Sequence, residues 1–397
     1  MKELQKPLLL YIQGGGDVSD TASQLRNLLA AVDRGKFQLR VLLAEDEPSR
    51  EIFETLNIPV DDVLVQKFTT HPEVDCCRVH PHIDWMALLP NRKLDRYLRQ
   101  VHPNVVHIIG QSLLQAGLSC KRVGVPVIWH VQSAALSGQN KLSTAVSGYV
   151  ISQCADHIIV DEEGVTPFDR DRRAILIHNS LDLQDLKQAA LHRSELREKY
   201  GLDADGVLIG MVGCLCEHSG AWDFIQAAGM IQHNLRDTSV RFMIVDPLPE
   251  WEDATSSEAK RRENKARHLA WQAGIENDFL MVHGYQDLLA LINTFDITVF
   301  FSPKGRLGGL GQKIMATGSP VVMVSSKNAI QGKQLSLVTS PRDVISLADI
   351  VTRLASDPAL RQQMRSKAAQ SEKWFDPAQN ARALEELDQQ ILGFIPA

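Results

Sequence analysis

The 397-residue sequence predicts an α/β protein made of two doubly wound parallel-sheet domains that face one another across a cleft. Three observations predict this fold class. Short apolar runs alternate with amphipathic stretches, as buried parallel strands joined by crossover helices do. These runs fall into two successive sets. The length suits two hydrophobic cores of roughly 180 to 200 residues each better than it suits one.

Each set contains enough apolar runs for a sheet of its own. The first set begins at Leu8, Leu39, Val105, Pro126, His157 and Ala174. The second set begins at Val207, Val240, Phe279, Ile297 and Pro320. We therefore expect the first set to form the N-terminal sheet and the second set to form the C-terminal sheet.

The stretches between the runs have the spacing of helices with one buried face, and a polar segment divides the two sets. The helical spacing is clearest at Leu25, Leu28, Leu29 and Val32, and at Leu347, Ile350, Val351 and Leu354. The polar segment follows Ile177, which predicts a hinge near residues 179–192. We expect domains at residues 1–185 and 186–375, and a final helix in 376–397 that can pack back toward the N-terminal domain.

Composition narrows the class of protein. With 44% hydrophobic and 23% charged residues the chain is neither disordered nor fibrous, and a net charge of −6 offers no basic face to nucleic acid. No apolar stretch reaches the ~18 residues that a bilayer span needs, and no signal-peptide cleavage site follows the first run. We expect a cytoplasmic protein whose membrane contact is at most peripheral, through the basic stretch after Glu258; a solvated helix face is the alternative.

The sequence favours neither a disulfide framework nor a metal site. The six cysteines show no repeated paired spacing, so they are expected to be free thiols. His80 and His82 lack a carboxylate or thiol pattern beside them, which favours a surface loop.

In the N-terminal half, two candidate sites follow apolar runs, where open parallel sheets bind ligands. Gly15 and Gly16 precede a helix, so backbone amides there could approach an anion; a tight turn is the structural alternative. His130 closes the run from Pro126 and opens a polar loop. A lone histidine is more often structural than catalytic, but the position at the carboxyl end of a strand adds weight to a role in the site. His107 lies inside a run and is expected to pack.

The C-terminal half has a glycine-rich basic segment between residues 302 and 324. Glycines and cations there surround a predicted helix start, namely Lys304, Arg306, Gly308, Gly309 and Lys313. Backbone amides and basic side chains at a helix N-terminus favour an anion site. A solvated basic loop is the alternative.

The order of several segments resembles the retaining GT-B glycosyltransferases of glycosyltransferase group 1, which are family 4-like enzymes, over nearly the whole chain. The matching segments are PNVVHIIGQSLLQAGLSCKRVGVPVIWHVQS, AILIHNSLDL, LREKYGLDADGVLIGMVGCL, HGYQDLLALINTFDITVFFSP and KIMATGSPVV. The resemblance implies two Rossmann-like domains that transfer a hexose from a nucleotide-sugar to a glycan, lipid or small-molecule acceptor, as in polysaccharide biosynthesis. It implies no cofactor and no metal. It also implies that His130 lies beside the reacting sugar and that Gly15 and Gly16 lie near the donor phosphates.

The resemblance fails at the donor site of the C-terminal domain. Cys214 and Ser219 stand where the family has an arginine and a lysine on the diphosphate, and Gly305 and Lys313 stand where it has two glutamates. Asp246 replaces an expected glycine. Charge-assisted hydrogen bonds contribute roughly 1.5 to 3 kcal/mol each, so losing two would weaken donor binding by several powers of ten unless they were replaced.

Three hypotheses follow. The chain is a transferase whose phosphate clamp has moved to Lys304, Arg306, Lys313 and the amides of residues 308–311. Alternatively, it is a catalytically inactive pseudoenzyme subunit that binds or stabilises a partner glycosyltransferase. The third hypothesis, a cleft enzyme for another phosphorylated ligand, has the least support.

Overall fold

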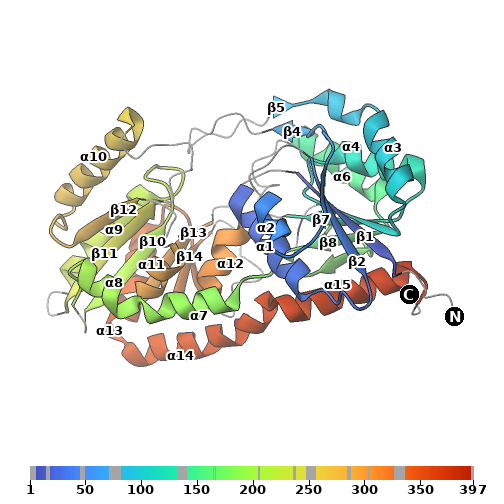
Figure 1. The fold of residues 1–397 in the computed structure, drawn as a ribbon. Helices are drawn as coiled ribbons and strands as arrows, with labels where there is room; N and C mark the ends of the chain where they lie inside the picture. Colours follow the sequence, from blue (N-terminus) through green and yellow to red (C-terminus); the bar gives the residue numbers. More distant parts are fainter. Residues whose placement is uncertain are drawn as a thin grey trace. The chain divides into compact units, whose positions relative to one another are not determined.

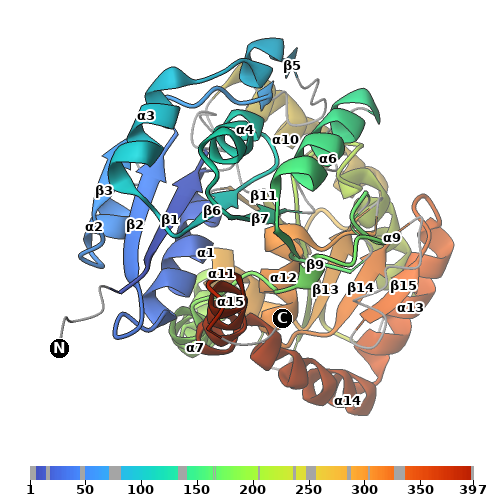
Figure 2. The same cartoon turned by 90° about the vertical axis from the view of Figure 1, so that its right-hand side faces the viewer.

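The computed structural model describes residues 6–14, 18–44, 50–70, 82–132, 141–163, 165, 167–203, 206–235, 238–246, 256–283, 288–302, 305–325 and 336–394. The chain forms two compact units (Figures 1 and 2). The N-terminal unit combines the chain up to Asp182 with the segment from Trp374 onward, and the C-terminal unit is built mainly from Leu183–Lys373. Each unit is described separately below.

A seven-stranded parallel sheet forms the centre of the N-terminal unit, in the order β3-β2-β1-β6-β7-β8-β9. Its strands are β1 (Leu8–Gln13), β2 (Gln38–Leu43), β3 (Val60–Asp62), β6 (Val105–Ile109), β7 (Val127–Val131), β8 (His157–Val160) and β9 (Ala174–Leu176). Two very short antiparallel strands, β4 (Thr69–Thr70) and β5 (His82–Ile83), lie apart from it. Successive residues of β1 point to opposite faces, so Leu9 and Tyr11 enter one apolar cluster and Leu10 and Ile12 the other.

Helices cover both faces of this sheet. One face packs against α3 (Arg92–Val101), α4 (Leu114–Val123), α6 (Lys141–Cys154) and the short η1 (Trp85–Leu88). The other face packs against α1 (Val18–Ala31), α2 (Arg50–Glu54) and the C-terminal helix α15 (Pro377–Ile391). This arrangement is a doubly wound fold.

Helix α15 is an integral part of the N-terminal unit, although it comes last in the sequence. It lies beside α1 (Figures 1 and 2) and buries Ala381, Leu384 and Leu387 in the same apolar cluster. Asp376 caps its first turn by accepting a hydrogen bond from the Ala378 amide, and a proline follows at the first helical position. The helix therefore completes one layer of this unit.

The C-terminal unit has a six-stranded parallel sheet in the order β12-β11-β10-β13-β14-β15. Its strands are β10 (Val207–Val212), β11 (Val240–Asp246), β12 (Phe279–His283), β13 (Ile297–Phe301), β14 (Val321–Val324) and β15 (Ser336–Thr339). The two parallel sheets confirm the predicted α/β class. The sequence prediction missed β3 and β15.

The helices of the C-terminal unit also lie on both faces of its sheet. One apolar cluster joins the sheet to α9 (Ala221–Asn234), α10 (Ser257–Gln272) and α13 (Val344–Ser356). On the opposite face of β10, the ring of Phe295 covers Gly210, just after α11 (Leu288–Thr294). Helix α11 packs on α7 (Leu183–Leu191) and α8 (Arg193–Lys199). The remaining helices are α12 (Gly308–Ala316), α14 (Pro358–Ala368) and the 3-10 segment η2 (Ala369–Phe375).

Gly220, which caps α9, should be the least replaceable glycine of this unit. Its φ is +81°, and an added Cβ would lie 1.9 Å from the ring of Phe301. We expect Gly220→Ala to lower the free energy of unfolding by about 2 to 5 kcal/mol, because left-handed backbone costs ~1 to 2 kcal/mol and overpacking ~1 to 3 kcal/mol. Chemical denaturation measures this loss.

Gly274→Ala is the matched control. Gly274 has a φ of +71°, but an added Cβ there would meet nothing within 4 Å. We expect it to cost only the backbone share, about 1 to 2 kcal/mol. Equal losses for the two variants would show that the contact with Phe301 contributes nothing.

None of the helices that the structure describes is both long enough and apolar enough to cross a membrane. The described cysteines, Cys120, Cys154, Cys214 and Cys216, are free, and all except Cys214 are buried. Cys76, Cys77 and His80 lie outside the described residues.

Candidate functional site

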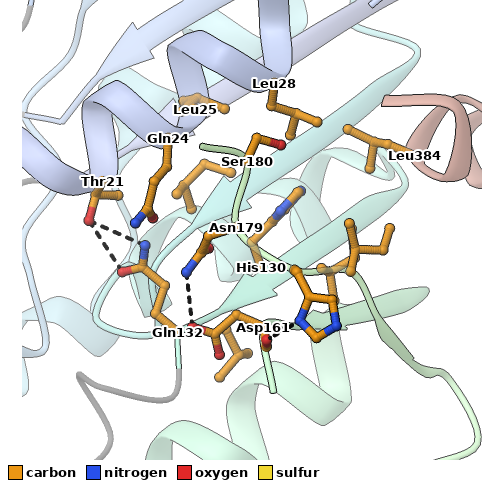
Figure 3. Close-up of a pocket in the computed structure, with 15 residues that line it drawn as sticks. Thr21, Gln24, Leu25, Leu28, His130, Gln132, Asp161, Asn179, Ser180 and Leu384 are labelled. Carbon is orange, nitrogen blue, oxygen red and sulfur yellow. Dashed lines mark hydrogen bonds between the residues drawn. The ribbon is translucent and has the colours of Figure 1, made fainter. Parts of the chain in front are cut away.

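A small pocket opens at the carboxyl ends of β7 and β8 in the N-terminal unit. Its volume is about 50 Å³, and α1, α15 and the segment 177–180 complete its wall (Figure 3). A cavity of about 10 to 15 Å³ already holds one water molecule, so this pocket has room for a few waters or for a hydroxyl group of a ligand. It is too small for a whole nucleotide-sugar.

The polar lining of the pocket consists of hydrogen-bonding groups that suit hydroxyls. Gln132 Nε2 donates to the hydroxyl of Thr21 at 3.2 Å, and Asn179 Nδ2 donates to a carboxylate oxygen of Asp161 at 3.3 Å (Figure 3). Gln24 contributes a third side-chain amide. No lysine or arginine occurs among the described residues of this lining. The pocket therefore offers donors and acceptors without the cations that a phosphate group requires.

His130 lies in this pocket, as its place at the end of β7 led us to expect. The alternation along β7 sends Trp129 and Val131 into the cluster under α4 and α6 and turns His130 to the opposite face. Its Nε2 lies 3.1 Å from Nδ1 of His107. Burial lowers the pKa of His130 well below the ordinary value of histidine, and the nearby His107 lowers it further. His130 is therefore neutral at physiological pH.

His107 does pack, as predicted, but it also bonds at both ring nitrogens, which sequence reasoning did not foresee. Its ring stacks on Tyr11, the residue opposite it in the β1–β6 pair, at 4.3 Å between ring centroids. Its Nε2 lies 2.9 Å from a carboxylate oxygen of Asp388, which α15 supplies. All three side chains are buried. Asp388, His107 and His130 thus form a continuous chain that ends in the pocket.

In the C-terminal unit, the loop after β10 contains two of the substituted family positions. The Ser219 hydroxyl lies 2.8 Å from the carbonyl oxygen of Cys216 and close to that of Cys214, and it accepts the Ala221 amide hydrogen at 3.3 Å. Ser219 therefore holds the turn into α9. Glu217 and His218, the charged or titratable residues of the same turn, are exposed.

Asp246 places a buried carboxylate beside this loop. It ends β11 and accepts a hydrogen bond from the Leu215 amide at 3.3 Å. A negative charge at this position opposes the binding of a second anion there.

The loop after β13 carries a cation, whereas Asp246 places a carboxylate beside the loop after β10. Ser302 accepts the Arg306 amide hydrogen at 2.8 Å and the Gly305 amide donates to the Ser302 carbonyl at 2.7 Å, so the segment forms a tight turn. Gly305 suits this turn because its φ is +70°. No carboxylate pairs with the Arg306 guanidinium in the part of the chain that the structure describes. Arg306 is therefore a cation at the carboxyl edge of the sheet.

Helix α12 begins directly after this turn. Gly308 and Gly309 are its first two residues, and its N-cap residue is Leu307, whose side chain makes no capping hydrogen bond. Lys313 lies in its last turn, about 7.5 Å along the axis from Gly308 at 1.5 Å per residue. The structure thus places Arg306 and the two glycines together and Lys313 further along. Gly15, Gly16 and Lys304 lie outside the described residues.

The described residues contain no group of three or more His, Cys, Asp or Glu side chains that could hold a metal ion.

Comparison with known proteins links this geometry to a family. Residues 192–371 match the family model of the glycosyl transferases group 1. No curated protein matches the chain.

Solved structures match nearly the whole chain at low sequence identity. HepE of Anabaena in complex with UDP is 16% identical, covering 98% of this chain and 100% of that one with a TM-score of 0.73. A glycosyltransferase from Rickettsia africae is 12% identical over 98% and 99% of the two chains, with a TM-score of 0.72. Sucrose-phosphate synthase from Thermosynechococcus elongatus is 14% identical over 98% and 100%, with a TM-score of 0.63.

Identities this low show the fold alone, whereas the family match is specific to the C-terminal unit. The chain therefore has the two-domain GT-B fold, and its residues 192–371 are similar to the glycosyl transferases group 1 family.

Proposed function

We propose that the protein is a glycosyltransferase that moves a sugar from a nucleotide-sugar to a hydroxyl of an acceptor. In this proposal the N-terminal unit binds hydroxyl groups in the His130 pocket. The C-terminal unit holds the donor phosphates at residues 304–313, so the family's phosphate clamp has been relocated.

The His130 pocket is the observation that carries the proposal. Its amides, hydroxyl, carboxylate and neutral imidazole are the groups that recognise sugar hydroxyls by hydrogen bonding. It lies at the carboxyl ends of parallel strands, where ligands of open α/β sheets bind. A pocket built for phosphate would have cations in its lining.

The relocated clamp is supported by the contrast between two loops of the same sheet. The loop after β10 has Cys214 and Ser219 where the resemblance implies two cations, and it lies beside the buried Asp246, whereas the loop after β13 brings Arg306 to the N-terminus of α12. The dipole of a helix N-terminus and a nearby cation favour a diphosphate. HepE, whose fold this chain shares, is known in complex with UDP-glucose, which supports a nucleotide-sugar as donor.

Calorimetry with UDP, GDP and ADP and their hexose derivatives tests this donor site. We expect one nucleotide to bind, and Arg306→Ala to weaken its affinity by about 10- to 150-fold, the equivalent of 1.5 to 3 kcal/mol. Lys313→Ala should also weaken binding if its side chain reaches the phosphates.

Arg353→Ala provides the control for Arg306, because Arg353 is an exposed arginine of α13 in the same unit. It should leave the affinity unchanged. Full affinity in Arg306→Ala would place the phosphates elsewhere, and a folded wild-type protein that binds no nucleotide would exclude the donor site altogether.

The alternative is an inactive subunit that binds a partner glycosyltransferase. It is favoured by Cys214 and Ser219 at the family's cation positions and by the buried Asp246 beside them. Under this alternative no nucleotide binds and a glycosyltransferase copurifies with the chain.

A further inference from the structure

The chain Asp388–His107–His130 fixes which nitrogens of its two imidazoles can carry protons. An ionised carboxylate can only accept hydrogen bonds, so opposite the Asp388 carboxylate His107 donates from Nε2 across the 2.9 Å contact. A neutral His107 then has a bare Nδ1. Across the 3.1 Å contact His130 must therefore donate from Nε2, which leaves its own Nδ1 unprotonated.

The contact with His107 engages only Nε2 of His130. His130 lines the cavity, and within the described part of the chain no hydrogen bond engages its Nδ1. The stacking of His107 on Tyr11, with 13° between the ring planes, fixes the middle imidazole of the chain. The lining around it, with Gln24, Gln132 and Asn179, is suited to binding hydroxyl groups.

We propose that Asp388 and His107 are positioning residues that hold His130 with an unprotonated Nδ1, so that His130 accepts the proton of a hydroxyl bound in this pocket. The identity of that hydroxyl as the sugar acceptor rests on the proposed function. The arrangement of the three side chains does not depend on it.

The proton transfer from the ligand hydroxyl through His130 to His107 balances in atoms and charge. The O–H bond of the ligand breaks, its electron pair stays on oxygen, and a new N–H bond forms at His130 Nδ1. The Nε2 proton of His130 moves to Nδ1 of His107. His107 then carries the positive charge, while its Nε2–H continues to donate to Asp388. No oxidant, reductant or metal takes part.

Electrostatics favour this distribution of charge. His130 is a poor place for the charge, because burial lowers its pKa well below the ordinary value and His107 lowers it further. On His107 the charge lies against the Asp388 carboxylate, and a buried carboxylate is costly until it is paired. A histidine held in one tautomer by a carboxylate is an efficient general base.

The other titratable groups around Asp388, His107 and His130 do not break the hydrogen bonds between these three residues. Tyr11 stays neutral, because burial and then the charges of Asp388 and Glu385 raise its pKa well above the ordinary value. The Glu385 carboxylate accepts hydrogen bonds from the Asp33 amide at 2.7 Å and from Nζ of Lys36 at 2.9 Å. Asp161 and His178 also line the pocket: His178 Nδ1 lies 3.0 Å from the backbone carbonyl oxygen of Asp161, and Asn179 donates to the Asp161 carboxylate.

Asp388→Asn is the critical variant, since it keeps the size of the side chain but can donate as well as accept a hydrogen bond. We expect long-range ¹H–¹⁵N NMR spectra of the ligand-free wild-type protein to show both histidines protonated at Nε2. In Asp388→Asn, a population of His130 protonated at Nδ1 should appear. This measurement needs no substrate. Its outcome therefore tests the proposed tautomers separately from the proposed transferase activity.

Glu385→Gln is the matched control, because Glu385 is a buried carboxylate of the same helix that does not contact His107. It should leave both tautomers unchanged. An His130 tautomer that is the same in wild type and in Asp388→Asn would overturn the proposal, as would wild-type His130 protonated at Nδ1.

The pH profile gives a second test once a donor and acceptor are in hand. Asp388→Asn should lower kcat at least 10-fold and move the acid limb of the profile to lower pH by one unit or more, because the carboxylate no longer stabilises the charge on His107. Glu385→Gln should move neither. An unchanged acid limb in Asp388→Asn would show that Asp388 has only a structural role.

Discussion

Removing the C-terminal helix is expected to unfold the N-terminal unit. A chain ending at Phe375 would lose the buried side chains of Leu384 and Leu387, each worth about 1.5 to 3 kcal/mol on burial, and would expose the cluster that they cover. It would also lose Asn380, which donates to the His178 carbonyl at 2.9 Å, and the contact of Glu385 with the Asp33 amide. Since domains have only ~5 to 15 kcal/mol of stability, the loss should be decisive.

Circular dichroism and chemical denaturation measure this effect, and the single variant Leu384→Ala should already cost about 2 to 5 kcal/mol. Arg382→Ala combined with Glu386→Ala is the control, because both residues are exposed on the same helix. These two changes should cost less than about 1 kcal/mol. A truncated chain that unfolds cooperatively at the wild-type midpoint would show that α15 does not stabilise the unit.

Replacing His130 is expected to have the largest effect on activity. If His130 accepts the proton of the acceptor hydroxyl, His130→Ala should lower kcat by about 100- to 10,000-fold, the usual contribution of a positioned general base. The change removes an imidazole from a pocket and not from the centre of an apolar cluster, so the protein should remain folded.

The matched control is His192→Ala, which removes an exposed histidine of the C-terminal unit. Its activity and melting temperature should equal those of the wild type. Rates are followed by release of the nucleoside diphosphate, and folding by thermal denaturation. Wild-type rates in a folded His130→Ala protein would assign the pocket a role other than catalysis.

Much of the fold could be predicted because buried parallel strands are continuous apolar runs. The runs from Leu8, Val105, Val207 and Ile297 all became strands at these residues. The strands that were missed lack that signal: β3 reads Val-Asp-Asp, and β15 begins and ends with a hydroxyl residue. Both strands lie at the edge of their sheet and pair with a single neighbouring strand. Their formation depends on that pairing more than on their own amino-acid composition.

The candidate site was only partly predictable. His130 could be found because it follows a strand directly, which is a local signal. The contact between His107 and Asp388 joins residues 281 positions apart, so no spacing rule could reveal it. One clue was available in principle: a polar residue inside an apolar strand needs a buried partner, and the final helix carries acidic residues among its apolar positions.

Turnover of a nucleotide-sugar by the wild-type protein tests the central claim most directly. The protein is incubated with UDP-, GDP- and ADP-hexoses and a panel of hydroxyl acceptors, and mass spectrometry follows the free nucleoside diphosphate and the glycosylated product. We predict that one donor is consumed with formation of product, and that Arg306→Ala and His130→Ala each reduce the rate. Consumption of no donor by a folded protein, together with no nucleotide binding, would contradict the claim.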